Sequence, residues 1–477
     1  MIKGHLGLLS MALLVLFTVR VNADGVTWDS PVRLTPEESV VQYSAIAVDL
    51  RGGVHVFWAN KPETGVSANQ ILYRYRDQQE WTETTDVLVG PEWDAFSRPA
   101  VLCDRANRLH LLWNSTQGLY YSSALADEAS DPRAWLSPVR VMQADAMGPT
   151  DLAISPDGIL HVVYTRYRSA TNLMYTRSED SGATWATPQA ISTIVADDKQ
   201  IPDAARLTID RRGILHVVWS ESYPPEYLGR QILYSQSLDN GLTWSAPQPL
   251  SGVAQDSAWN ALPNIVVDSE DQLQVVWACG DPVMRCYRSS IDHGVSWTGV
   301  TEPLFQQLIG SSGRDAMAAD PHGNVFWAGS LRFPQAFYFS TLTDGAWRAP
   351  PQALVTEGQF GGLASAHFPQ MVIGEGNQLH LVLVESDGGP LWYLHGQSSY
   401  PRVEAEIEEA MPTPTMTPTA APINEPTATL PTPTPQIRPL ATPEASSSGI
   451  SPLLISTAAV TAFLLLALAV SRKRNRS

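Results

Sequence analysis

Three near-copies of an eight-residue motif most constrain what this chain can fold into. They span residues 178–185, 237–244 and 290–297, each reads S-x-D-x-G-x-T/S-W, and each lies between two apolar segments. An Asp side chain can accept hydrogen bonds from N–H groups of its own turn, and Gly tolerates positive φ. The motif therefore predicts a tight hairpin turn, built three times, with its Trp packed back on the strands. The fixed positions are Ser178, Asp180, Gly182 and Trp185; Ser237, Asp239, Gly241 and Trp244; and Ser290, Asp292, Gly294 and Trp297.

A second repeat gives the number of units. An apolar strand, an Asp, a turn with Gly and a His-led apolar run recur from His55 to His380, with a mean step of about 54 residues. Seven units can be counted, and each has room for four short strands. The sequence therefore predicts an all-β, seven-bladed β-propeller over residues 24–400. A six-bladed propeller, in which one unit is an insertion, is the alternative.

The two ends of the repeat array fit each other. The seventh unit has three predicted strands and ends near Leu391–Leu394, whereas residues 25–34 near the N-terminus form one further apolar segment with a Trp. We expect this segment to supply the outer strand of the seventh blade. Closing the ring in this way would remove exposed sheet edges.

The repeated motif resembles the Asp-box, or BNR repeat, of sialidases and related β-propellers, over about residues 24–400. The resemblance implies a structural turn at the propeller rim, not a catalytic group. It implies two functional classes: an exo-α-sialidase, which cleaves terminal sialic acids, or a non-catalytic propeller that binds glycans or protein partners at its channel mouth. We favour recognition, because seven blades, an incomplete arginine set and only a loose F-R-I-P motif at Phe96–Pro99 depart from the sialidase pattern.

Segments outside the propeller predict a surface protein. Residues 1–23 read as a signal peptide, and residues 450–470 are an uncharged apolar run long enough to span a bilayer. A basic tail at 471–477 places the C-terminus in the cytosol and the propeller outside the cell. Residues 401–449 are rich in Pro and Thr and predict a disordered stalk. We expect a single-pass cell-membrane protein and a monomer; a sortase signal is the alternative reading of the C-terminal segment.

Charge and cysteine content limit the partners. The formal net charge is −17, which argues against nucleic acid and means that an anionic ligand must be captured by a local arginine cluster. Cys279 and Cys286 flank a predicted hairpin and could form a disulfide, whereas Cys103 reads as a core residue. No metal-ligand spacing is present, so we expect neither a metal nor a cofactor.

Two arginines mark the predicted mouth of the channel. Arg98 and Arg314 share one register at the start of the inner strands, where the other units carry Tyr, Pro, Ala, Leu or Phe. Together they could bind a carboxylate; the alternative is that they pair with Asp315 or other acids. Arg206 lies one or two residues deeper. Further candidate ligand-binding residues at the mouth are Asp203, Asp315, Trp93, Trp259 and His367.

The catalytic alternative requires a carboxylate to activate a tyrosine nucleophile. The sialidase resemblance implies Glu221 with Tyr223 or Tyr227 for this pair, and Asp151 or Asp203 as the acid. The alternative interpretation is that Glu221 only solvates its loop. The five repeated histidines are interpreted as structural residues that bind a neighbouring backbone group, because residues one blade apart cannot converge on one ion.

Overall fold

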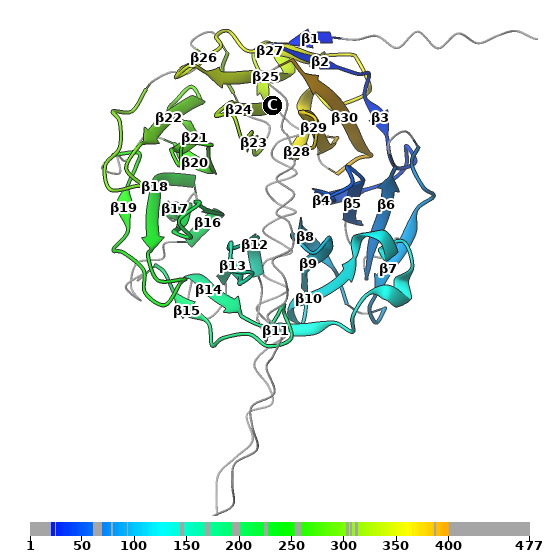
Figure 1. Cartoon of the computed structure of the whole chain (residues 1–477). Helices are drawn as coiled ribbons and strands as arrows, with labels where there is room; N and C mark the ends of the chain where they lie inside the picture. Colours follow the sequence, from blue (N-terminus) through cyan, green and yellow to red (C-terminus); the bar gives the residue numbers. More distant parts are fainter. Residues whose placement is uncertain are drawn as a thin grey trace, which may run out of the picture. The chain divides into compact units, whose positions relative to one another are not determined.

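The computed structural model describes residues 21–23, 25–60, 69–77, 80–92, 94–143, 147–166, 172–192, 201–223, 228–252, 259–301, 305, 308–310, 313–385 and 388–399. Within this part the chain is all-β apart from three 3₁₀ helices, at Ala126–Glu128, Pro132–Ala134 and Leu363–Ser365. Seven antiparallel sheets stand around a central axis, as Figure 1 shows, so the seven-bladed prediction is confirmed and the six-bladed alternative is wrong.

Blades one to four each contain four strands, listed from the centre outward. Blade one has β4 (Val41–Val48), β5 (Val54–Asn60), β6 (Gln70–Arg76) and β7 (Thr85–Val89). Blade two has β8 (Ser97–Cys103), β9 (Arg108–Ser115), β10 (Gly118–Leu125) and β11 (Val139–Gln143). Blade three has β12 (Met147–Ile154), β13 (Leu160–Arg166), β14 (Leu173–Ser178) and β15 (Gln189–Ala190). Blade four has β16 (Ile201–Ile209), β17 (Leu215–Tyr223), β18 (Leu228–Ser237) and β19 (Gln248–Pro249).

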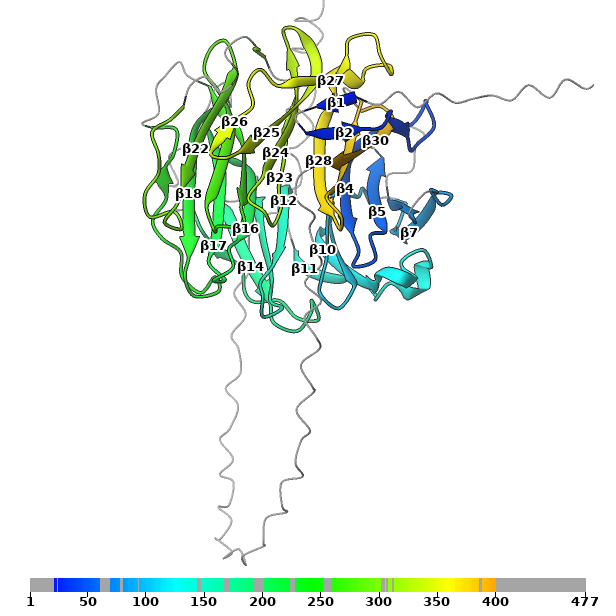
Figure 2. The ribbon, with the colours of Figure 1, turned by 45° about the horizontal axis from the view of Figure 1, so that its top comes forward.

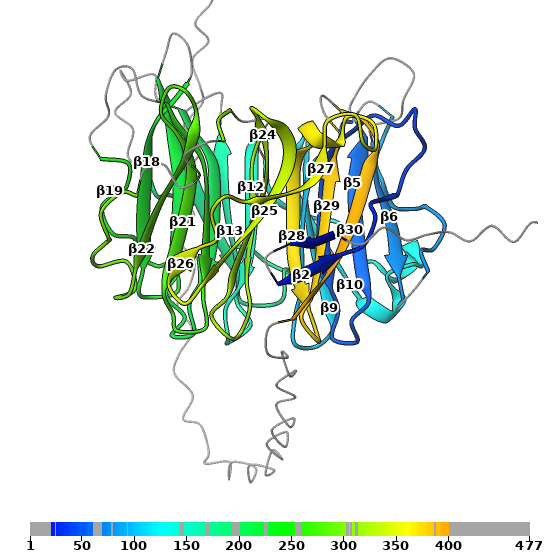
Figure 3. The same cartoon turned by 90° about the horizontal axis from the view of Figure 1, so that it is seen from above.

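The remaining three blades differ in their outer strands. Blade five has β20 (Asn260–Val267), β21 (Leu273–Cys279) and β22 (Met284–Ser290). Blade six has β23 (Ala316–Ala319), β24 (Val325–Arg332) and β25 (Gln335–Thr343), and both β26 (Ala346–Trp347) and β27 (Gln352–Thr356) pair with β25. Blade seven has β28 (His367–Gly374), β29 (Gln378–Val384) and β30 (Leu391–Ser398). Figure 3 shows the blades from the side.

The N-terminal segment closes the ring as predicted. β2 (Val26–Trp28) and β3 (Val32–Arg33) both pair with β30, and β1 (Val21–Ala23) pairs with β2 outside it (Figure 2). Trp28 is 1 % exposed and lies edge-on to Phe339 of blade six, with ring centroids 5.0 Å apart. Blade seven therefore takes its outer strands from the first residues of the propeller and its inner strands from the last.

The apolar core is divided among the interfaces between blades. The repeated tryptophans are 0–2 % exposed and lie in clusters that combine strands of adjacent blades, which confirms their interpretation as inter-blade packing; they are Trp58, Trp113, Trp219 and Trp277. Because every blade buries both of its faces, the stability of the ring depends more on packing between neighbouring blades than on any single sheet.

The three Asp-box turns have one geometry. In the first copy, Ser178 Oγ accepts a hydrogen bond from Gly182 N–H and Asp180 Oδ1 accepts one from Thr184 N–H, both at 2.8 Å. The other two copies repeat both bonds at the same distance. Hydrogen bonds from the hydroxyl and then the backbone N–H of Thr184 lower the pKa of Asp180, and the same two groups of Ser296 bring the pKa of Asp292 to about 2. The predicted turn is therefore confirmed.

Each Asp-box turn packs against a tyrosine of the preceding blade. The Trp185 ring lies edge-on to Tyr121 with centroids 5.5 Å apart, and the Tyr121 hydroxyl donates to Ser181 O at 2.8 Å. The later copies contact Tyr175 and Tyr234 in the same way. A Cβ on the motif glycine would overlap this tyrosine ring in every copy. The glycine is therefore required by packing as well as by positive φ.

The same tyrosines explain the repeated histidines. In each of the five histidines, Nδ1 shares a hydrogen bond with a tyrosine hydroxyl of the same blade at 2.7–2.8 Å. In blades one, two and four, Nε2 also lies 3.0–3.5 Å from an aspartate carboxylate of the adjoining turn. The partners are side chains rather than the backbone group predicted from the sequence, because the strand register places a tyrosine beside each histidine. Their structural role is as predicted.

Blade three lacks one member of this hydrogen-bond chain. Ser155 takes the place of the turn aspartate, and His161 Nε2 has no hydrogen-bond partner in a side chain that is fully buried. Burial lowers the pKa of His161 to about 4. In the unfolded chain, His161 therefore takes up a proton near pH 6.5, whereas in the folded blade it does so only at lower pH.

The predicted segments beyond the propeller lie outside the described residues: the signal peptide up to residue 20, the stalk, the apolar run 450–470 and the basic tail. By contacts the chain divides into two units, Met1–Ile407 and Glu408–Ser477, and every described residue belongs to the first. Among the described residues there is no helix with the length and apolar character needed to cross a bilayer.

We expect Gly241→Ala to destabilise the propeller more than Gly213→Ala. Both glycines have φ +81°, so each alanine incurs about 1 kcal/mol of backbone strain. Only at Gly241 would the new methyl group overlap a side chain, that of Tyr175, which adds at least about 1 kcal/mol. Urea unfolding of the two variants measures the difference, and equal midpoints would contradict the packing role of the Asp-box turn.

We expect Ser155→Asp to stabilise the propeller by about 1 kcal/mol at neutral pH by giving His161 Nε2 an acceptor. Wild-type stability should fall as pH drops from about 6.5 toward 4, because the pKa of His161 is lowered on folding. A carboxylate at position 155 raises that pKa and should reduce the loss. Thermal unfolding between pH 4 and 8 tests this, with Ser155→Asn as the uncharged control; identical acid slopes would contradict it.

Candidate functional site

One end of the channel is formed by the first residues of the inner strands. In six blades the register of the inner strand shifts at this point, as between Ser97 and Ala100 of β8. At four of these bulges a non-glycine residue has φ between 48° and 58°; these residues are Arg98, Ala204, Leu262 and Phe368. A bulge redirects side chains, so at this end the side chains do not simply alternate between the two faces of each sheet. We call it the mouth. The three Asp-box turns, which follow the third strands of blades three, four and five, lie at the opposite end.

A cavity of about 100 Å³ opens at the mouth and is lined by residues of six blades. Its volume suits about three water molecules or one acidic group. The polar and aromatic residues that line it are Tyr43 and Ser44 from β4, Arg98 from β8, Thr150 and Asp151 from β12, Arg206 from β16, Arg314 before β23, and Phe368 and Gln370 from β28. Three arginines far apart in the sequence therefore share one small cavity.

Arg98 is held by an aromatic stack. Its guanidinium carbon lies 4.4 Å from the centroid of the Tyr43 ring, and Tyr43 contacts Phe368 with centroids 4.8 Å apart. A cation over an aromatic face is stabilised by the ring quadrupole while its N–H groups remain able to donate sideways. Blades one, two and seven thus combine to present one arginine to the cavity.

Arg206 reaches the cavity beside a carboxylate. Its Nη1 lies 3.8 Å from Asp151 Oδ1, and Asp151 Oδ2 accepts a hydrogen bond from Leu207 N–H at 2.9 Å. Burial raises the pKa of Asp151 above its usual value, although Arg206, two backbone N–H groups and Arg314 all act to lower it. Asp151 is therefore easier to protonate than an exposed aspartate, and it sits among the arginines.

The side chain of Arg314 is 11 % exposed, against 16 % for that of Arg206. Arg314 Nη2 lies 4.0 Å from Asp203 Oδ1. Burial lowers its pKa to about 10; the positive charges of Arg206 and Arg98 act in the same direction and Asp203 opposes them. These opposing effects show that the three cations repel one another across the cavity, which favours an anion between them.

The other predicted residues fall elsewhere. Glu221 is 6 % exposed and lies on β17, where it pairs with Gln231 of β18. Like Trp259 and His367, it is not among the residues that line the cavity. Tyr223 ends the same strand, two residues from Glu221. Trp93 and Tyr227 lie outside the described residues.

Asp315 does not pair with the mouth arginines. It is 3 % exposed and binds Arg285 of blade five instead, at 2.5 and 2.7 Å. The alternative is therefore wrong for Asp315, whereas pairing with another acid holds for Arg314, whose Nη2 lies 4.0 Å from Asp203 Oδ1. Sequence reasoning missed Arg285, since nothing in the repeat marks it. It also did not name Gln370, whereas the register that marked Arg98 placed Tyr43 at the same level.

The site has the residues to bind an anion and none of the groupings that bind a metal. Three guanidinium groups line the cavity with one carboxylate, that of Asp151, and Asp203 lies outside the lining at 4.0 Å from Arg314. The local charge is therefore positive in a chain of net charge −17. Among the residues that the structure describes, no three His, Cys, Asp or Glu side chains are placed to hold a metal ion. The arginines can donate paired hydrogen bonds to a carboxylate or sulfate.

Comparisons with known proteins show the fold alone. No family model and no curated protein matches the chain. An ulvan lyase of polysaccharide lyase family PL25 is similar in structure, with 12 % identity, a TM-score of 0.55 and coverage of 77 % of this chain and 96 % of its own. The BP39L lectin from Burkholderia pseudomallei has 16 % identity, a TM-score of 0.53 and coverage of 75 % and 96 %. The NanB sialidase from Streptococcus pneumoniae has 10 % identity and a TM-score of 0.44, with coverage of 77 % and 71 %.

Proposed function

We propose that this protein is a glycan-recognition propeller that binds an acidic group of a saccharide in the arginine cavity at its mouth. The observation that carries the proposal is the convergence of Arg98, Arg206 and Arg314 on one cavity of about 100 Å³. We place the acidic group among the three arginines and the rest of the ligand across the open mouth. A carboxylate is the favoured group because paired guanidinium donors match its two oxygens.

Recognition is favoured over catalysis by the position of the predicted nucleophile pair. Glu221 is buried in β17 and does not line the cavity, so it does not stand beneath the arginines as an activating base would. Exo-sialidase activity remains the second candidate because Asp151, with its raised pKa, lies in the cavity as an acid would. Release of 4-methylumbelliferone from its sialic-acid conjugate tests this directly, and turnover abolished by Asp151→Asn would favour the hydrolase.

The predicted signal peptide and apolar segment support a cell-surface location for this activity. The ligands we propose are therefore glycans of surrounding surfaces or of secreted proteins. Cell fractionation, with protease protection of the C-terminal tail, tests this location, and a soluble cytosolic protein would contradict it.

We expect Arg98→Ala and Arg314→Ala each to weaken binding of 3′-sialyllactose at least about tenfold, since a charge-assisted hydrogen bond contributes about 1.5–3 kcal/mol. Isothermal titration calorimetry of the full-length protein measures the affinity, with lactose as the neutral ligand. Arg51→Ala is the control variant, because Arg51 is 72 % exposed and pairs with Asp127 away from the mouth. Binding that survives both cavity variants would contradict the proposed site.

We expect affinity for 3′-sialyllactose to rise as pH falls from 7 to 5. The pKa of Asp151 is raised in the free protein, and an anionic ligand raises it further, so binding is coupled to proton uptake. Asp151→Asn should bind more tightly at pH 7 and lose this pH dependence. Titrations at pH 5, 6 and 7 check both, and a pH slope retained in Asp151→Asn would assign the dependence to another group.

A further inference from the structure

Arg314 differs from the other two cavity arginines in how its backbone is held. Arg206 is paired with Val218 in the ladder of β16 and β17, and Arg98 lies within the bulge of β8. The ladder of β23 and β24 begins only at Ala316, so Arg314 precedes it. Burial and the charges of the other two arginines both disfavour the charged Arg314 side chain in its place. Asp203 offsets these effects only from 4.0 Å, so the way the neighbouring backbone is held matters for keeping Arg314 in the cavity.

The next residue, Asp315, supplies a rigid anchor. Arg285 Nε donates to Asp315 Oδ2 at 2.5 Å and its Nη2 donates to Oδ1 at 2.7 Å, while Trp327 Nε1 also donates to Oδ2 at 3.0 Å. The side chains of Arg285 and Asp315 are 1 % and 4 % exposed. A bidentate pair that is shielded from water fixes both the distance and the orientation of the carboxylate.

Neighbouring residues complete the anchor. Asn264 Nδ2 donates to the Asp315 carbonyl oxygen at 3.1 Å, so the backbone of Asp315 is held as well as its side chain. Gly329 on β24 leaves the space that the carboxylate occupies, because a Cβ there would overlap Asp315 Oδ1. Asp315 is thus fixed by blades five and six together, and Arg314 is one peptide bond away.

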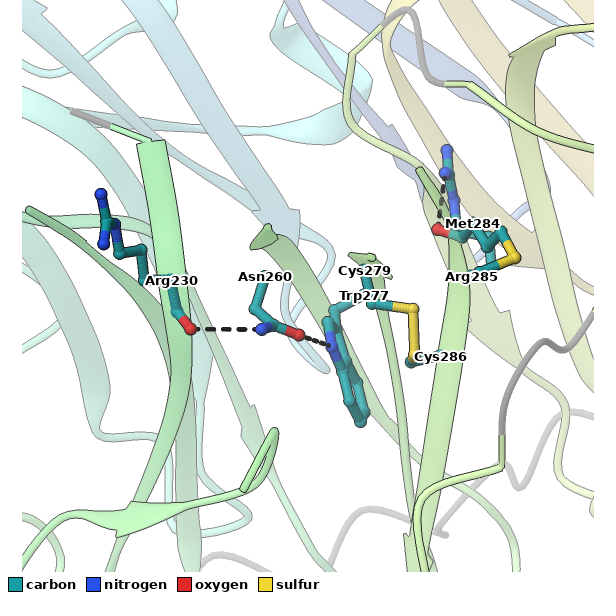
Figure 4. The surroundings of a disulfide bond; sticks show 7 residues. All are labelled: Arg230, Asn260, Trp277, Cys279, Met284, Arg285 and Cys286. Carbon is teal, nitrogen blue, oxygen red and sulfur yellow. Dashed lines mark hydrogen bonds between the residues drawn. A yellow bond between two sulfur atoms is a disulfide. The ribbon is translucent and has the colours of Figure 1, made fainter. Parts of the chain in front are cut away.

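Arg285 is itself part of a cross-linked hairpin. Cys279 of β21 and Cys286 of β22 form a disulfide, and Arg285 directly precedes Cys286 (Figure 4). The turn of the same hairpin contacts two loops beside the mouth: Gly280 N–H donates to Trp259 O at 2.8 Å, and Gly310 N–H donates to Val283 O at 2.7 Å. The disulfide therefore secures a hairpin that contacts the segments on both sides of it.

We propose that Arg285 is a positioning residue of the arginine cavity, which keeps Arg314 in place through Asp315 and is itself held by the Cys279–Cys286 disulfide. Arg285 is not among the residues that line the cavity, so it acts on an anion only through Arg314. Its effect on ligand affinity rests on the proposed function. Its effect on the position of Arg314 does not.

The first test measures the position of Arg314 without a ligand. Full-length protein is treated with phenylglyoxal, which modifies accessible guanidinium groups, and modification of the Arg314 peptide is followed by mass spectrometry. We expect a severalfold faster rate in Arg285→Lys and in Cys279→Ser/Cys286→Ser. Arg288→Lys is the matched control, because Arg288 lies on the same strand but donates to Thr298 O and Leu250 O. An unchanged rate in Arg285→Lys that remains folded by circular dichroism would overturn the proposal.

The second test uses 3′-sialyllactose as the probe in a double-mutant cycle. We expect Arg285→Lys to weaken its binding about tenfold in the wild-type background and to have little effect in the Arg314→Lys background. Equal losses in both backgrounds would indicate a general structural role and overturn the positioning role. If wild-type protein does not bind the probe and Arg314→Lys changes nothing, the proposed function fails, while the phenylglyoxal rates still decide the role of Arg285.

Discussion

The hydrogen-bonded contact between a tyrosine of one blade and the Asp-box turn of the next is the interaction on which the middle of this ring depends. In blade two the chain of contacts runs from Asp104 through His110 to Tyr121 and ends at the turn carbonyl of Ser181 in blade three. It satisfies buried polar groups that would otherwise be costly and joins two sheets side by side. Because the same contact recurs, successive blades repeat one relative orientation, and their inner strands converge at the mouth.

The two ends of the propeller therefore have different roles. The Asp-box end contains turns that are saturated by their own hydrogen bonds, and it contributes to stability through inter-blade contacts. The mouth contains bulges, residues with positive φ and three arginines around one cavity. Strained backbone and like charges are unfavourable by themselves, so the rigid ring has to offset them. Such a concentration of positive charge in an acidic protein is the physical basis of the anion site that we propose.

The three arginines reach the cavity by three different physical means. Arg98 leaves a strand at a bulge and stacks on Tyr43, Arg206 is carried by a paired strand beside Asp151, and Arg314 depends on the buried pair of its neighbour Asp315. Each arginine is held by residues of a different blade from its own. The site is therefore a property of the closed ring and not of any one repeat.

The sequence by itself determined the repeat and the closing strand, favoured seven blades over six, and allowed a disulfide between Cys279 and Cys286, because strand periodicity and turn chemistry are local. It also placed Arg98 and Arg314 at one level, since the register is shared by all units. Only the tertiary structure decided that Arg206 joins them and that Asp315 turns away toward Arg285. The direction of a side chain at a bulge depends on partners from other blades, and a repeat pattern does not predict those partners.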